Sequence, residues 1–326
     1  RLRDRRPAHA RFEQGSLRMA VGDFVEVLPA PVAVRVGCAS ATWRDYVTLT
    51  KPRIMSLLVL TSVCAMIAAA HGTPAAPALI ALVVGGGLAC GGASALNHVL
   101  DRDIDQLMGP RTASRPVAAG RISPARATAF GLVLTALAFA LLVVFTNPLA
   151  ALLSLSGGAF YVGVYTYWLK RTTSQNIVIG GAAGAIPPLA GWAAAHGSLG
   201  VGAVFLFVIV LLWTPPHFWA LALLLVRHYA AAEVPMMPVV RGPQATARLI
   251  FWYSVLLLAV TLVPGAIGTF GPVYLISATI LGGVLCALAG RLWRRHSHAN
   301  AALLFHYSLL YLALLFVAVA IDAAVH

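Results

Sequence analysis

Long apolar runs separated by short polar stretches dominate the pattern of residues along the chain. Nine of these runs contain no Asp, Glu, Lys or Arg. A helix needs about 20 apolar residues to cross the hydrocarbon layer of a bilayer, and each run is close to that length. The pattern therefore predicts nine membrane-spanning helices, near residues 54–70, 76–98, 127–145, 149–167, 176–195, 202–226, 249–268, 273–289 and 301–321.

The composition agrees with an all-α polytopic membrane protein. The chain of 326 residues is 60% hydrophobic and only 10% charged, which is too apolar for a soluble domain of this size. Small residues are frequent in the runs, as in "VVGGGLACGGASA", and they let helices approach closely in lipid. We expect one nine-helix bundle over residues 41–326, around a central cavity open near the cytoplasmic surface.

The first 40 residues differ from the rest because they are rich in Arg and lack helical periodicity. This predicts a disordered cytoplasmic N-terminal tail over residues 1–40. A mitochondrial transit peptide is the alternative. Such peptides are poor in acids, so four residues argue against it: Asp4, Glu13, Asp23 and Glu26.

All 23 Lys and Arg residues lie before the first apolar run or in every second loop. Basic residues concentrate on the cytoplasmic side of membrane proteins, so the N-terminus is predicted to be cytoplasmic and the C-terminus outside. The net charge of +13 then reflects orientation, and we expect no nucleic-acid partner. The predicted location is the plasma membrane of a bacterium, with the mitochondrial inner membrane as the alternative.

The charged segment "NHVLDRDIDQLMGPRTASRP" follows the second apolar run directly. Asn97, Asp101 and Asp105 are four residues apart, so they share one helix face, whereas Asp103 points elsewhere. Two carboxylates one turn apart repel each other unless a cation lies between them. Oxygen ligands of this kind suit Mg²⁺, which often combines one or two carboxylates with substrate phosphates.

Arg111 and Arg115 follow the acids, and guanidinium groups match the geometry of phosphate oxygens. The segment therefore predicts a site for Mg²⁺ and a diphosphate at the membrane surface, with an ordinary solvated loop as the alternative. An isoprenoid diphosphate would place its tail among the helices, where a dry pocket permits an allylic carbocation. These residues do not identify the acceptor.

Two spans carry proline pairs, Pro187-Pro188 and Pro215-Pro216. Proline frees a backbone carbonyl, which membrane helices tolerate where it faces protein or a cavity. The pairs indicate either simple packing kinks or spans that line an internal pocket. His217 follows the second pair, and a histidine inside a span is either packed and hydrogen-bonded or part of a functional site.

The segment "NHVLDRDID" resembles the N-x3-D-x3-D motif of the intramembrane prenyltransferase superfamily, and "RTASRP" resembles its trailing basic segment. "YTYWLKRTTSQNIVIGGAAGAIPPLAGW" and "WTPPHFWALAL" are similar to the haem O synthase (protohaem IX farnesyltransferase) branch, over about residues 44–320. The resemblance implies a nine-helix bundle. It also implies transfer of farnesyl from farnesyl diphosphate to a vinyl group of haem B, with water added, giving haem O for haem-copper terminal oxidases.

The resemblance further implies roles for individual residues. The catalytic group that holds Mg²⁺ and diphosphate would be Asn97, Asp101 and Asp105. Phosphate or the haem propionates would bind a basic set: Arg111, Arg115, Lys170 and Arg171. Asn176 would cap a helix or orient a substrate, and His217 would approach the haem iron. A downstream haem A synthase is the expected protein partner.

The loop "RHYAAAEVPMMPVVRG" departs from the family, whose members usually carry an acid where this chain has His228. If the loop stays helical, Tyr229 and Glu233 share a face, and Glu233 could reach a second Mg²⁺. A solvated loop glutamate is the alternative.

Two other functions remain open from the sequence. A prenyltransferase could act on a quinone precursor or chlorophyllide, although the segments in the fifth and sixth spans count against it. A non-enzymatic transporter would also use kinked helices, but its site should lie near the midplane of the membrane rather than at one surface.

Overall fold

The computed structural model describes residues 41–325, which are helical apart from short connections. Within this range, nine helices are long and apolar enough to cross a membrane, which confirms the predicted number. They are α3 (Pro52–Ala70), α4 (Ala76–Leu100), α7 (Pro124–Phe145), the continuous α8 (Pro148–Ala159), η2 (Phe160–Leu169) and α9 (Lys170–Thr172), then α10 (Asn176–His196), α11 (Val201–Leu224), α14 (Gly242–Ala266), α15 (Pro272–Arg294) and α16 (His298–Val325). The tail predicted over residues 1–40 lies outside the described residues.

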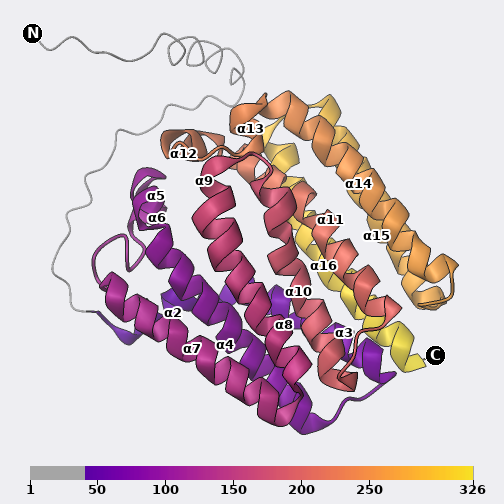
Figure 1. Ribbon diagram of the computed structural model, residues 1–326. Helices are drawn as coiled ribbons and strands as arrows, with labels where there is room; N and C mark the ends of the chain where they lie inside the picture. Colours follow the sequence, from indigo (N-terminus) through magenta and orange to yellow (C-terminus); the bar gives the residue numbers. More distant parts are fainter. Residues whose placement is uncertain (1–40, 326) are drawn as a thin grey trace, which may run out of the picture.

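Short helices gather at one end of the bundle, from the upper left to the top of Figure 1. They are α5 (Arg102–Leu107), α6 (Pro110–Ala113), α12 (Val226–Ala231) and α13 (Met237–Val240), beside the short α9. The C-terminus lies at the opposite end. The helix α2 (Trp43–Thr50) leads into α3. The loops rich in basic residues therefore share one end of the molecule.

Helix starts follow local chemistry. Proline occupies the first turn of α3, α4, α7, α8, α14 and α15, where its missing amide hydrogen costs nothing. Ser123 caps α7 by accepting a hydrogen bond from the amide of Arg126, and Asn147 caps α8 by accepting one from Ala150.

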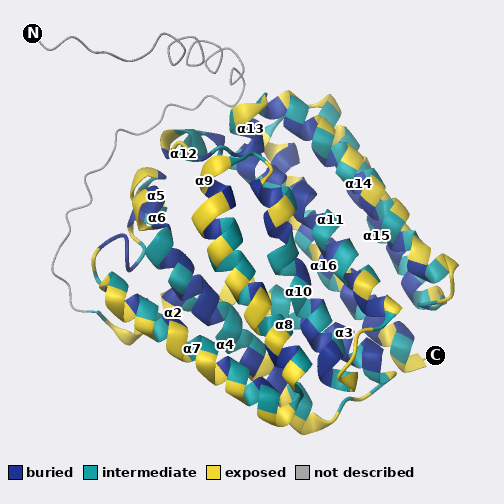
Figure 2. Ribbon diagram, viewed as in Figure 1, coloured by how far each residue is buried: buried dark blue, intermediate teal, exposed yellow. Residues whose placement is uncertain are grey.

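Close helix packing depends on glycine, as the small residues predicted. A methyl group on Gly92 of α4 would lie 2.7 Å from the carbonyl oxygen of Gly131 in α7. A methyl group on Gly191 of α10 would overlap the Ser62 carbonyl of α3. Burial differs among the spans: α11 is the most buried and α7, with many exposed residues in Figure 2, is the least.

The proline pairs lie inside helices α10 and α11, which continue through them. Pro188, Pro215 and Pro216 are buried within the protein. These three prolines thus face protein rather than lipid, the setting in which membrane helices tolerate such residues.

The fourth span contains a feature that the sequence did not predict. Phe160–Leu169 forms a π-helix within a run predicted as an ordinary α-helix. π-Helical turns are rare and are frequent at functional sites. This one contains Thr166 and ends just before Lys170, two residues of the cluster described next.

Candidate functional site

Asn97, Asp101 and Asp105 come together at the junction of α4 and α5. The helix breaks at Asp101, yet the amides of Asp101 and Asp105 still donate to the carbonyls of Asn97 and Asp101, at 2.9 and 2.8 Å. The predicted four-residue spacing is therefore kept across the break. The three residues are 3%, 1% and 1% exposed, so the structure buries a motif that could have been a solvated loop.

Each member of this motif contacts a cation from another part of the chain. Lys170 Nζ lies 2.6 Å from Asp101 Oδ2, and Arg115 Nη1 lies 2.5 Å from Asp105 Oδ1. Lys51 Nζ donates to Asn97 Oδ1 at 2.8 Å. The Asn97 amide nitrogen donates to Asp101 Oδ2 at 2.7 Å. We call these six residues the carboxylate cluster: Lys51, Asn97, Asp101, Asp105, Arg115 and Lys170.

The sequence did not predict the roles of Lys51 and Thr166. Lys51 joins α2 to α3 with a left-handed φ of 51°, and the Lys-Pro pair before a span resembles a simple interfacial anchor. Thr166 is fully buried in the π-helix and accepts a hydrogen bond from the Asn97 amide at 3.1 Å. The π-helix thus supplies both Thr166 and, at its end, Lys170.

The carboxylate cluster fits a divalent cation with a diphosphate. Asp101 Oδ1 and Asp105 Oδ2 are buried and have no hydrogen-bond partner within the described chain. Carboxylate oxygens are the ligands that Mg²⁺ prefers, and Mg²⁺ usually takes its remaining ligands from water and phosphate. Residues 41–325 contain no group of three or more His, Cys, Asp or Glu placed to hold a metal. The protein itself therefore offers two carboxylates.

The electrostatics of the cluster favour an anionic ligand. Burial raises the pKa of Asp105, against the lowering effect of Arg115. Desolvation, with the neighbouring charges of Arg115 and Lys170, lowers the pKa of Lys51 to about 7. Three basic residues thus surround two acids. A bound diphosphate would relieve the repulsion among the basic residues.

Asp103 and Arg171 form a separate, exposed ion pair. Two hydrogen bonds of 2.7 Å join the Arg171 guanidinium to the Asp103 carboxylate, and Nη2 also donates to the Leu100 carbonyl at 2.6 Å. The Asp103 side chain is 59% exposed, and the Arg171 hydrogen bonds lower its pKa to about 2. Asp103 therefore points away from the cluster, as predicted. Arg171, predicted to bind phosphate or the haem propionates, holds this outer pair, and Arg111 is exposed on α6.

Asn176 and His98 are buried with their side-chain nitrogen and oxygen atoms lacking hydrogen-bond partners in the described chain. The prediction that Asn176 caps α10 was wrong. Gln175 occupies the N-cap position and Asn176 is the first helical residue, so its side chain makes no capping hydrogen bond. The structure leaves its amide available to orient a substrate, and His98 lies next to Asn97 on α4.

His217 is a packed residue of the bundle. Its ring stacks between Trp213 and Phe305, with centroids 4.4 and 4.7 Å away, and Nδ1 lies 2.7 Å from Ser308 Oγ. Aromatic rings and the Ser308 hydroxyl therefore engage the ring and its Nδ1 atom. This geometry matches the packing alternative.

The expectation for Glu233 was wrong in its structural premise. The helix α12 ends at Ala231, so Tyr229 and Glu233 share no helical face, and Glu233 is an exposed residue with a φ of 54°. It lines a surface pocket together with Asp103 and Arg171. Glu233 therefore stands with the outer ion pair, and it forms no three-acid metal group with Asp101 and Asp105. The His228 ring lies beside Gly109, where an added methyl group would be 3.0 Å from its Cδ2 atom.

Solved structures define the class of fold. The chain is similar to digeranylgeranylglyceryl phosphate synthase, with a TM-score of 0.72 and 17% identity over 87% of this chain and 99% of that one. It is also similar to a UbiA homologue from Archaeoglobus fulgidus bound to GPP and Mg²⁺, with a TM-score of 0.60 and 14% identity over 84% and 99% of the two chains. The chain therefore shares the fold of these two proteins.

The chain belongs to the UbiA prenyltransferase family, whose sequence profile matches residues 58–318. The protoheme IX farnesyltransferase of Gloeobacter violaceus is 51% identical over 87% of this chain and 93% of its own length. That of Roseiflexus castenholzii is 50% identical over 86% of this chain and 52% of its own length. The protein of the same name from Thermus thermophilus is 46% identical over 98% of this chain and 51% of its own length. The chain thus spans about half the length of several curated relatives that it matches.

Proposed function

We propose that this protein transfers the farnesyl group of farnesyl diphosphate to a vinyl group of haem B, giving haem O and diphosphate. The observation that carries the proposal is the carboxylate cluster, in which two buried acids each retain one unpartnered oxygen among three basic residues. The name shared by the relatives, protoheme IX farnesyltransferase, supports haem B as the acceptor.

The carboxylate cluster would bind the diphosphate end of the substrate. Asp101 and Asp105 would hold Mg²⁺, which when bound neutralises charge on the departing diphosphate. The UbiA homologue bound to GPP and Mg²⁺ supports this pairing of metal and prenyl diphosphate. Lys51, Lys170 and Arg115 would move from their present partners towards the phosphate oxygens, because a diphosphate carries more negative charge than one carboxylate.

The farnesyl chain would lie in a cavity among the apolar helices, open near the cytoplasmic end. Breaking its C1–oxygen bond leaves an allylic cation, and a dry environment protects this cation from early hydrolysis. The terminal carbon of the haem vinyl group then bonds to C1. Water adds to the resulting cation next to the macrocycle and releases a proton, so the product carries a hydroxyl group.

The remaining candidate residues would position the acceptor. The buried amide of Asn176 would orient a substrate, and exposed Arg111 would meet a haem propionate or a phosphate at the membrane surface. Arg171 would do the same only after leaving Asp103. His217 would reach haem iron through Nε2 or serve as packing between Trp213 and Phe305.

The proposed cellular location rests on the membrane spans and on the relatives. The protein has nine candidate spans among its described residues, and its relatives are bacterial. We place it in a bacterial plasma membrane with a cytoplasmic N-terminus and an external C-terminus. Haem O is an apolar product, so direct transfer to a downstream haem A synthase would spare it exposure to water.

The test uses the full chain in lipid nanodiscs with farnesyl diphosphate, haem B and Mg²⁺. Mass spectrometry should detect haem O and an equal amount of diphosphate, with no product when Mg²⁺ is chelated. A quinone precursor in place of haem B serves as the matched acceptor. If the quinone precursor were prenylated and no haem O formed, haem B would be the wrong acceptor but the prenyltransferase activity would stand. If no farnesyl diphosphate were consumed, both the acceptor and the activity would be wrong.

A further inference from the structure

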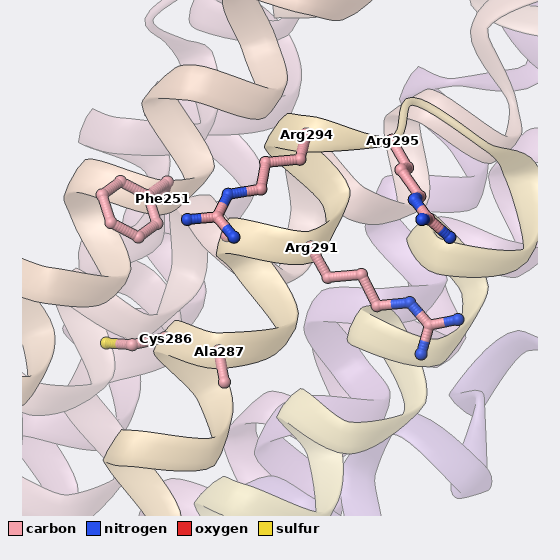
Figure 3. A pocket seen from close by; sticks show the side chains of 7 residues that line it. Phe251, Cys286, Ala287, Arg291, Arg294 and Arg295 are labelled. Atoms are coloured by element: carbon pink, nitrogen blue, oxygen red, sulfur yellow. The ribbon is translucent and has the colours of Figure 1, made fainter.

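A cavity that opens to the surface lies between α14 and α15, apart from the carboxylate cluster. It has a volume of about 550 Å³, within the range of small-molecule sites. Its apolar part is formed by Phe251, Cys286 and Ala287, and its rim by Arg291, Arg294 and Arg295. Figure 3 shows the Arg294 side chain extending towards Phe251, with Arg291 and Arg295 on the other side of the helix end.

The three rim arginines have no acidic partner among the described residues. Ion pairs in this part of the chain join Asp45, Asp101, Asp103 and Asp105 to other cations. Glu233 lines the pocket that contains Arg171, and Asp322 accepts from the amide of Gly271, next to the opposite end of α15. The protein therefore leaves three positive charges around one cavity without compensating acids.

Two ordinary effects explain why arginines occur at this helix end, but they do not explain the cavity. Basic residues in the last turn of α15 stabilise the helix dipole, and cytoplasmic loops of membrane proteins are rich in arginine. Both effects would be satisfied by arginines that point into water from any exposed position. Neither accounts for a cavity with apolar walls directly beneath the charged rim.

Aromatic residues beside this cavity indicate its depth in the membrane. Phe251 lies 5.3 Å from Trp252 and 5.1 Å from Trp293 between ring centroids, and the two tryptophans lie 6.4 Å apart. Tryptophan concentrates at the level of lipid headgroups, where its ring is partly in hydrocarbon and its N–H partly in water. Arg294 and Arg295 follow Trp293 directly and Arg291 lies two residues before it, so the arginine rim lies at the level of this tryptophan, near the lipid headgroups.

We propose that the cavity between α14 and α15 binds an anionic phospholipid. The Arg294 guanidinium, which extends towards Phe251, would bind its phosphate, because the arginine fork matches phosphate oxygens. Arg291 and Arg295 would add positive charge on the other side of the headgroup. Phe251, Cys286 and Ala287 would contact the glycerol and the first carbons of the acyl chains. Basic pockets between membrane helices on the cytoplasmic side bind lipid headgroups in this way. The site is independent of the prenyl transfer.

The test is native mass spectrometry of the full chain titrated with phosphatidylglycerol, phosphatidylcholine or inorganic pyrophosphate. The wild type should retain phosphatidylglycerol more tightly than phosphatidylcholine. The double variant Arg291→Gln/Arg294→Gln should weaken phosphatidylglycerol binding roughly twenty-five-fold, about five-fold for each arginine near the surface. Arg126→Gln, which removes an exposed arginine on α7, is the control and should bind as the wild type does.

A second variant separates the cavity from its charge. Ala287→Trp fills the apolar part and keeps every arginine, so it should lose phosphatidylglycerol binding as well. If the double variant fails to accumulate in the membrane, Ala287→Trp still tests whether the cavity binds phosphatidylglycerol. Equal binding of the two lipids, unchanged binding in Ala287→Trp, or an equal loss in Arg126→Gln would overturn the proposal. Displacement of phosphatidylglycerol by pyrophosphate would assign the cavity to a soluble anion instead.

Discussion

Asp101 and Asp105 each use one carboxylate oxygen to hold a basic residue and bury the other without a protein partner. An unpartnered carboxylate oxygen inside a protein is costly unless a ligand completes it. The basic partners lower that cost while no diphosphate is bound, and they are already in place when one arrives. The same residues would thus stabilise the site without ligand and bind its phosphate groups.

The buried and exposed acids of this segment predict different mutational effects. Asp101→Asn or Asp105→Asn keeps the size of the side chain but removes a charge from the proposed Mg²⁺ site, so we expect a loss of roughly a hundred-fold or more in turnover. Asp103→Asn should be mild, because Asp103 is exposed and pairs with Arg171. The measurement is haem O formed per amount of protein in the membrane. An Asp101 variant with full activity would remove Asp101 from the site.

Lys51 provides a second test at this scale. Its contact with Asn97 places an ammonium group beside the proposed diphosphate. Lys51→Gln should raise the KM for farnesyl diphosphate about ten-fold, the size of one charge-assisted hydrogen bond. Arg53→Gln removes an exposed charge two residues away and is the matched control. Equal KM values for Lys51→Gln and the control would show that Lys51 only supports Asn97.

The sequence could predict the acids of the site because their spacing is local. Four-residue steps place Asn97, Asp101 and Asp105 on one face, whatever the rest of the fold does. Lys51 could not be found in this way, since 46 residues separate it from Asn97 and only the packing of α3 near α4 brings them together. The prediction for Glu233 was wrong for the opposite reason. A local helical rule was extended past Ala231, where the chain turns into a left-handed conformation.

The spans were predictable because the length of each is fixed by the thickness of a bilayer. The backbone hydrogen bonding within and just after a span was not predictable. The π-helix at Phe160–Leu169 and the break at Asp101 leave the apolar pattern unchanged, because they alter only the hydrogen bonding of the backbone. Both features lie beside the carboxylate cluster. Irregular geometry in these helices therefore coincides with the candidate site, to which Thr166, Lys170 and Asp105 belong.

Two glycines of α10 give a matched pair for the packing of spans. A methyl group on Gly191 would overlap the Ser62 carbonyl, whereas one on Gly184 would meet nothing within 4 Å. Gly191→Ala should lower the free energy of unfolding by about 1–3 kcal/mol, the usual cost of overpacking. Gly184→Ala should leave it unchanged or raise it slightly, since alanine favours helix. The measurement is thermal loss of the monodisperse protein in detergent, and equal midpoints for the two variants would contradict the close contact of α10 with α3.

At the scale of the whole molecule, charge and chemistry share one end of the bundle. The carboxylate cluster, the outer Asp103–Arg171 pair and the arginine rim of the α14–α15 cavity lie where the connections rich in basic residues gather (Figure 1). Farnesyl diphosphate has a charged end that stays in water and a tail that favours hydrocarbon. A site at the membrane surface serves both parts of such a substrate, whereas a midplane site would require its diphosphate to enter the bilayer.

The orientation of this end is the last prediction. Every Lys and Arg lies on the side predicted to be cytoplasmic, and the connections at the other end carry none. Reporter fusions after Arg171 and Arg295 should therefore be active in the cytoplasm, and fusions after Thr73 and Ser198 should be active outside it. The fusions at Thr73 and Ser198 are separated by four predicted spans, so one missed or spurious span between them would place their reporters on opposite sides. A cytoplasmic signal at Ser198 would overturn the nine-span topology. Signals reversed at all four positions would keep the nine spans and place the carboxylate cluster outside the cell, away from a cytoplasmic supply of diphosphate substrate.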